Sequence, residues 1–148
     1  MRADPALRRR LSRPLPRAEK LRLAVEIAAS YLRVRRRIRS AKLEELLALL
    51  RGEVTDARVA AWRVPDEHVR AVRVARPVGR LLPRLPGDSR CLTQSLVLTA
   101  MLARRGIGSS VVIAVSPAPE FKAHAWVEHG GVPLLTPGDA GYGRLVEL

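Results

Sequence analysis

The chain has 148 residues, which suffices for one domain with a buried core but is short for two full domains. Its formal net charge is +13, and residues 1–51 carry 15 basic and 5 acidic side chains, so this segment attracts acidic partners. A single cysteine excludes an internal disulfide and a cysteine-rich zinc site. The apolar stretches are too short to span a bilayer, and we expect a protein of the reducing cytoplasm with no membrane anchor.

The first half of the chain is predicted to be helical and basic. Residues 1–16 contain three prolines and no sustained periodicity, which predicts an extended arm. From residue 17 to about residue 38, apolar side chains recur at three- and four-residue spacing without Pro or Gly, which indicates an amphipathic helix. A leucine-rich run over residues 43–50 predicts a second helix packed on the first. We expect a basic helical lobe over residues 1–84.

A third helical pattern begins near Asp66, and Pro77 should kink or end it. Arginines recur at three- or four-residue spacing and form one basic stripe if the helix persists: Arg70, Arg73, Arg76, Arg80 and Arg84. A solvated face is the more common meaning of such a stripe. The functional alternative is a docking track for an acidic peptide, in which Arg73, Arg76 and Arg80 are candidates for substrate binding.

The remaining residues, 85–148, are predicted to form a small core of one helix and an antiparallel sheet. The expected elements are a helix over residues 90–105 ended by Gly106, strands over 110–115 and 122–129, a Gly130-Gly131 turn and a hairpin partner over 132–135. The sequence therefore predicts the α+β class: an N-terminal helical lobe and a core in which one helix is followed by a small antiparallel sheet.

The only cysteine, Cys91, opens the predicted core helix, and about thirty residues later His124 lies in a predicted strand. A thiol attacks as the thiolate, and backbone N–H groups at a helix N-terminus favour that negative charge. A nearby imidazole takes the thiol proton and later gives it to the leaving amine. This order of residues is typical of papain-like or transglutaminase-like acyl-transfer sites, so we expect a core of that type with Cys91 as nucleophile and His124 as general base.

The other two histidines fit this role less well. His129 points to the opposite face of its strand from His124, and His68 lies in the third helix without an obvious partner. Trp126 and Glu128 alternate with His124 on one face, and Trp126 is a candidate for substrate binding.

Two groups are candidates for the oxyanion hole. One is the backbone N–H of Cys91, and the other is the side chain of Gln94, one helical turn further on and facing the same side. Neither this site nor any other part of the sequence calls for a metal ion or a cofactor, and we expect none.

Three short segments carry a more specific pattern. They are Leu85-Pro86 with Cys91-Leu92-Thr93-Gln94-Ser95-Leu96, then Leu102-Ala103-Arg104-Arg105-Gly106-Ile107, then Ala123-His124-Ala125-Trp126-Val127-Glu128 with Gly131. Together and in this order they resemble the transglutaminase-like leader peptidases of lasso-peptide biosynthesis, over roughly residues 81–135. The resemblance implies a cysteine endopeptidase that removes the leader from a ribosomally made precursor peptide. It also implies a small leader-recognition protein that delivers the precursor, and a macrolactam cyclase that acts afterwards.

The resemblance places the third catalytic residue, an Asp or sometimes a Glu that orients the histidine, at Thr136. A threonine cannot stabilise an imidazolium by charge. Asp139 would serve if Pro137-Gly138 bulges the strand, and it is our prediction for this role. Glu128 shares a face with His124 but sits about 6.6 Å along the same strand, which is an awkward reach.

Two other functions are compatible with the same residues. Transglutaminase or amidase chemistry would use the same site, and the transglutaminase differs from a peptidase in that an amine instead of water accepts the acyl group. A catalytically inactive protein would use the basic lobe to bind an anionic peptide or nucleic acid, and Thr136 favours this alternative. Nucleic acid is the less expected partner, because aromatic residues for base stacking make up only 3% of the chain.

Overall fold

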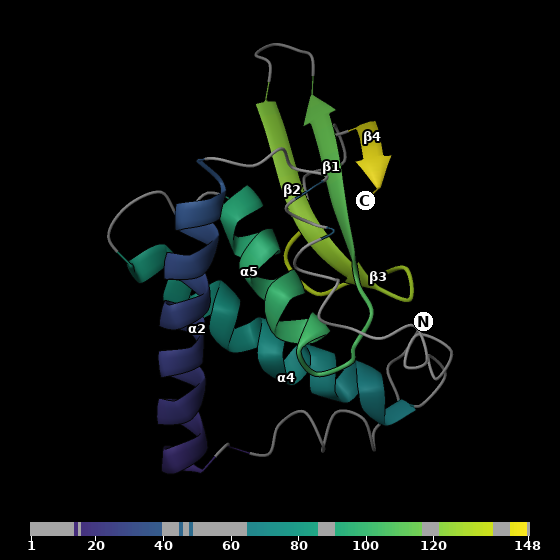
Figure 1. Ribbon diagram of the computed structural model, residues 1–148. Coiled ribbons are helices and arrows are strands. Elements are labelled where there is room, and N and C mark those ends of the chain that lie inside the picture. The colour runs from purple at the N-terminus through teal and green to yellow at the C-terminus, as the bar shows by residue number, and fades with distance from the viewer. Residues whose placement is uncertain are drawn as a thin grey trace.

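The computed structural model describes residues 14, 16–39, 45, 48, 65–85, 91–116, 122–137 and 143–147. These residues form an α+β fold in which helices pack on one four-stranded antiparallel sheet (Figure 1), and the predicted fold class is confirmed. The elements in chain order are α2 (Arg17–Arg37), α4 (Pro65–Leu81), the short 3-10 helix η2 (Leu82–Arg84), α5 (Cys91–Ala103), β1 (Ser110–Ser116), β2 (Lys122–His129), β3 (Val132–Pro133) and β4 (Gly143–Glu147).

Helix α5 is the centre of the fold because its residues are apolar on nearly every side. Ten of its 13 residues are buried, namely Thr93 and Ser95–Ala103. It contacts β1 and β2 of the sheet and also helices α2 and α4 (Figure 1). A helix that is hydrophobic all round is stable only where other elements cover it, and here a sheet and two helices do so.

The C-terminal end of α5 follows the prediction made from Gly106. This glycine adopts a left-handed conformation with φ 66°. Its N–H donates to the carbonyl of Ala103 at 2.8 Å, and the N–H of Ile107 donates to the carbonyl of Leu102 at 3.0 Å. These two bonds form a Schellman motif, which satisfies the last carbonyls of the helix and turns the chain towards β1.

The two helices of the first half agree with the sequence analysis in part. Helix α2 has nearly the predicted bounds, and it buries Ile27, Tyr31 and Val34 in the core. Helix α4 does not end at Pro77 but continues to Leu81. Val78 and Leu82, which follow the proline, are both fully buried. Their burial favours continuation of the helix, although Pro77 cannot donate a backbone hydrogen bond.

The sheet has the strand order β3-β2-β1-β4. Strands β1 and β2 cover the predicted ranges and pair without a register shift from Ser110 opposite Glu128 to Ser116 opposite Lys122. Gly130 and Gly131 join β2 to β3 with φ values of 58° and 76°, which a two-residue hairpin turn of type I′ requires.

Two features of the sheet differ from the sequence analysis. Strand β3 is shorter than predicted, ending at Pro133, although the N–H of Leu134 still donates to the carbonyl of Val127 at 2.8 Å. Strand β4 was not predicted at all, and it pairs with β1 across a register shift between Ile113 and Ala114. A five-residue strand that follows glycine-rich sequence carries little periodicity of its own, so only its pairing with β1 identifies it.

Several expectations fall outside the described residues. They concern most of the arm over residues 1–16 and, except for Glu45 and Ala48, the second helix over residues 43–50. The division into residues 1–84 and 85–148 stays a prediction. In the described part, α2, α4 and α5 contribute to one hydrophobic cluster. None of the described helices has the length and hydropathy needed to cross a bilayer.

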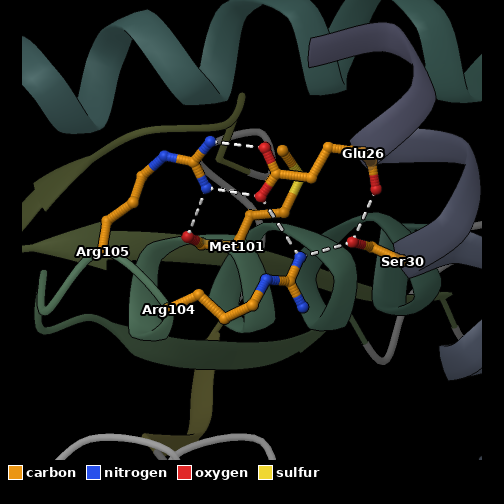
Figure 2. A network of polar contacts seen from close by, with 5 residues as sticks. All are labelled: Glu26, Ser30, Met101, Arg104 and Arg105. Atoms are coloured by element: carbon orange, nitrogen blue, oxygen red, sulfur yellow. Dashed lines mark hydrogen bonds and ion pairs between the residues drawn. The ribbon is translucent and has the colours of Figure 1, made fainter. Parts of the chain in front are cut away.

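A network of polar contacts joins α2 to the end of α5 (Figure 2). The guanidinium of Arg105 donates to both carboxylate oxygens of Glu26, at 2.7 and 2.5 Å, and also to the carbonyl of Met101 at 2.9 Å. Arg104 donates to the hydroxyl of Ser30 at 2.6 Å. Bonding to Arg105 holds the pKa of Glu26 below its usual value despite partial burial. The two arginines therefore anchor α5 to α2 as well as marking the helix end.

We predict that Glu26→Gln lowers the free energy of unfolding by about 1–2 kcal/mol, because it removes a charge-assisted pair that is only partly exposed to solvent. A carboxylate with a lowered pKa stabilises the folded state above its unfolded pKa, and this contribution is lost as pH falls through the folded pKa. Wild type should therefore lose its advantage over the variant below about pH 4.5. Urea unfolding at pH 7 and at pH 3.5 measures both effects.

The matched control is Glu19→Gln, which removes a carboxylate from an exposed position on the same helix. It should change stability by less than about 0.5 kcal/mol. Equal midpoints for the two variants at pH 7 would show that the Glu26 network contributes nothing beyond surface charge.

Candidate active site

Cys91 is the first residue of α5, and its free thiol is half-buried. The first turn of a helix has backbone N–H groups without acceptors inside the helix, and these groups favour a nearby negative charge. The rest of α5 is fixed in the core, so the position of this turn is fixed as well. The location suits a thiolate nucleophile.

His124 is the third residue of β2 and is half-buried. Strand β2 contacts α5, and both elements begin at the same end of the helix and sheet pair (Figure 1). The tertiary structure thus places the predicted nucleophile and the predicted base at one end of two packed elements, although 32 residues separate them in the sequence.

The face of β2 that carries His124 is not the face that α5 covers. Val127 belongs to the large cluster that contains α5, whereas Trp126 belongs to a second cluster on the sheet. Alternate residues of a strand share a face, so His124 lies on the same face as Trp126. The two faces of β2 meet at its edge, where β3 pairs only with the last two residues of the strand, so this edge is the route by which the His124 ring would approach Cys91.

Trp126 supports the His124 ring from within the sheet. The two ring centroids lie 6.0 Å apart with an interplanar angle of 26°. The indole Nε1 of Trp126 donates to Oε1 of Glu128 at 2.8 Å, and both side chains are buried. The predicted shared face of these three residues is thus observed. Because Trp126 is only 5% exposed, its proposed contact with substrate stays a prediction, and its visible role is packing.

The His124 ring is also held by a main-chain group that the sequence analysis did not consider. Its Nε2 atom lies 2.9 Å from the carbonyl oxygen of Thr136. The only sequence signal for this contact is the Thr-Pro dipeptide, because a residue before proline is restricted to extended conformations. Asp139, our predicted third member, lies outside the described residues.

The roles of the remaining candidate residues stay predictions. Gln94 is half-buried one turn after Cys91. Because α4 persists to Leu81, Arg73, Arg76 and Arg80 lie on one helix, with Arg73 half-buried and the other two exposed. Within the described ranges, no three His, Cys, Asp or Glu residues are grouped to bind a metal ion.

His68 and His129 form a separate pair between α4 and β2. Their ring centroids lie 5.9 Å apart, and Nδ1 of His129 lies 2.7 Å from the carbonyl oxygen of Gly108. Burial, and secondarily the charge of His129, lowers the pKa of His68. His68 thus has a partner that the sequence did not reveal, and the pair lies on the other face of β2 from His124.

The family model of the transglutaminase-like superfamily matches residues 29–147, which is most of the chain. The chain belongs to the transglutaminase-like superfamily. This superfamily includes cysteine peptidases. Comparisons with curated proteins and with solved structures gave no match.

The superfamily match spans both Cys91 and His124 as well as all four described strands. It therefore covers the helix start and the strand that the sequence analysis selected for acyl-transfer chemistry. It also covers part of the basic first half, from residue 29 onwards, so the C-terminal part of helix α2 is a portion of the superfamily domain.

We predict that Trp126→Phe lowers the free energy of unfolding by about 1–3 kcal/mol, because it removes the indole donor from a buried carboxylate oxygen of Glu128. Chemical unfolding of wild type and the variant measures the change. An unchanged free energy of unfolding would contradict a stabilising role for this hydrogen bond.

Proposed function

We propose that this chain is a cysteine peptidase that removes the leader from a ribosomally made lasso-peptide precursor. The observation that carries the proposal is the placement of a free thiol at the first residue of buried α5, with a histidine on the strand that α5 contacts. Membership of a superfamily that includes cysteine peptidases supports the reaction type. The three sequence segments that resemble leader peptidases support the substrate class.

The proposed reaction uses the residues in a fixed order. Cys91 gives its proton to His124 and attacks the scissile carbonyl as a thiolate, forming a C–S bond. The backbone N–H of Cys91 and the side chain of Gln94 are the proposed donors to the oxyanion. The imidazolium of His124 then protonates the leaving amine as the C–N bond breaks. Water, deprotonated by His124, hydrolyses the thioester and releases the leader with a free carboxylate.

Two alternatives use the same residues. If an amine replaces water in the second half of the reaction, the protein is a transglutaminase, and an amidase would act on a side-chain amide. A catalytically weak or inactive binding protein is favoured by one observation, the threonine at the position where the resemblance places an acid. Product analysis by mass spectrometry separates hydrolysis from amine transfer.

We predict that Cys91→Ala abolishes cleavage of the precursor peptide while the protein stays folded, because the thiolate forms the covalent intermediate. His124→Ala should lower the rate to a similar extent, and the double variant should be no slower than either single variant, because the members of a catalytic unit are not additive. Single-turnover cleavage measured by mass spectrometry, with circular dichroism as the folding control, gives the rates.

Cleavage by Cys91→Ala at a rate near that of wild type would rule out the proposed nucleophile. Alkylation of wild-type Cys91 by iodoacetamide provides a readout that needs no substrate, since an activated thiol reacts faster near neutral pH than an inert one. A slow reaction, equal to that of His124→Ala, would favour the inactive binding protein.

Helix α2 has an exposed side that is both apolar and basic. Leu21, Val25 and Leu32 are 69%, 62% and 53% exposed, although all three are apolar. Helical spacing places them on one side, away from the buried residues of α2. Exposed arginines accompany them in the C-terminal half of the helix and just beyond its end: Arg33, Arg36 and, two residues after the helix, Arg39.

We propose that this apolar and basic side of α2 binds the small leader-recognition protein. The matching surface of that partner would be a strip of apolar residues flanked by carboxylates. Charge complementarity supports an acidic partner, because the arginines would attract its carboxylates over about 8–10 Å at physiological salt. A second copy of this chain is a poorer occupant, since an antiparallel pair of α2 helices would place Arg33 and Arg36 opposite the N-terminal half of the helix, which is also basic.

We predict that the triple variant Arg33→Glu/Arg36→Glu/Arg39→Glu raises KM for the partner-bound precursor about tenfold and changes kcat less than twofold, because only association is affected. Raising the salt concentration should weaken wild-type association in the same direction. The comparison variant Arg76→Glu/Arg80→Glu reverses charges on α4 instead. A larger KM effect from the α4 variant would move the docking surface to α4, and no effect from either would leave the charge without a role in docking.

A further inference from the structure

The described structure contains a group in contact with His124 that differs from the acid implied by the family resemblance. The ring Nε2 lies 2.9 Å from the carbonyl oxygen of Thr136, whereas Oε1 of Glu128 accepts a hydrogen bond from Trp126. We propose that the main-chain carbonyl of Thr136 is a positioning group of His124 and selects the tautomer of its ring. This inference rests on the proposed function in that it assigns His124 to the reaction.

The contact determines which ring nitrogen acts as the base. A carbonyl oxygen can only accept a hydrogen bond, so Nε2 must be the donor and carry the hydrogen. In a neutral imidazole the other nitrogen, Nδ1, is then the basic one. The thiol proton of Cys91 goes to Nδ1, and the same nitrogen later releases it to the leaving amine. The carbonyl thus selects the tautomer without taking part in proton transfer.

Local sequence explains why this carbonyl points at the ring. The N–H of Leu134 donates to the carbonyl of Val127 at 2.8 Å, so the chain that follows β3 stays beside β2. Pro137 then disfavours the helical conformation for Thr136 and keeps it extended. Trp126 contacts the ring from the sheet side, so the carbonyl and the indole together limit its rotation.

A carbonyl dipole stabilises the imidazolium less than a full negative charge would. The contact therefore fixes the tautomer of the ring and does not itself supply the charge that a carboxylate would. Nε2 carries a single hydrogen, so a carbonyl that accepts it also competes with Asp139 for the role that the sequence analysis gave to that residue. The two assignments therefore predict that kcat is lowered in different variants.

The test combines nuclear magnetic resonance with kinetics on the full chain. In wild type labelled with ¹⁵N-histidine, the His124 Hε2 proton should exchange slowly with solvent because it is hydrogen-bonded. Pro137→Gly, which frees the Thr136 backbone, should make this signal exchange fast and lower kcat at least tenfold, with KM changed less than twofold. The matched control Pro133→Gly, at an exposed residue of β3, should keep both the signal and kcat.

Two results would overturn the proposal. One is Pro137→Gly with an unchanged Hε2 signal and unchanged kcat. The other is Asp139→Asn with the Hε2 signal lost and kcat lowered more than a hundredfold, which would assign the ring to that carboxylate. The exchange measurement needs no substrate, so it still decides the role of Thr136 if Cys91→Ala proves active. Failure of the proposed peptidase function is thus distinguishable from failure of this inference.

Discussion

The burial of α5 is the constraint on which the rest of the structure depends. A helix that is apolar on nearly every side cannot face water, so it requires the sheet on one side and helices α2 and α4 on the other. This requirement makes the two halves of the chain share one core. It also fixes the start of the helix, which is where the only cysteine lies. The candidate nucleophile is therefore presented by a helix that is buried along most of its length.

The second end of α5 is fixed by polar contacts instead of apolar ones. Gly106 closes the helix, and the two preceding arginines bind Glu26 and Ser30 of α2. The two arginines and the glycine thus have separate tasks within one short sequence. The glycine supplies a backbone conformation, and the arginines join two helices that are distant in the sequence. Movement of α5 relative to α2 would break the contacts of the two arginines with Glu26 and Ser30. These contacts therefore favour a fixed position for α5 and for Cys91 at its start.

The environment of His124 contrasts with that of Cys91. The cysteine is held by a buried helix, whereas the histidine lies near the edge of the sheet and contacts the Trp126 indole and the Thr136 carbonyl. These two contacts orient the ring. The exposed apolar and basic side of α2 is a separate surface that the core does not use.

The sequence by itself determined the elements and the candidate nucleophile and base. Periodicity predicted α2, β1 and β2 closely, since each element satisfies its own backbone and buries one face or all faces. Glycine predicted the end of α5 and the β2–β3 turn, because few other residues adopt those backbone angles. The single cysteine at a helix start and the histidine in a strand were visible for the same local reasons.

Only the tertiary structure decided the features that depend on contacts between distant segments. Helix α4 continues through Pro77 because its later residues are needed in the core, and β4 exists because β1 offers it an edge. The same is true of the His124 ring, which meets a main-chain carbonyl twelve residues away. A side-chain pattern cannot reveal a partner that belongs to the backbone, because every residue has a carbonyl and only the path of the chain decides where it points.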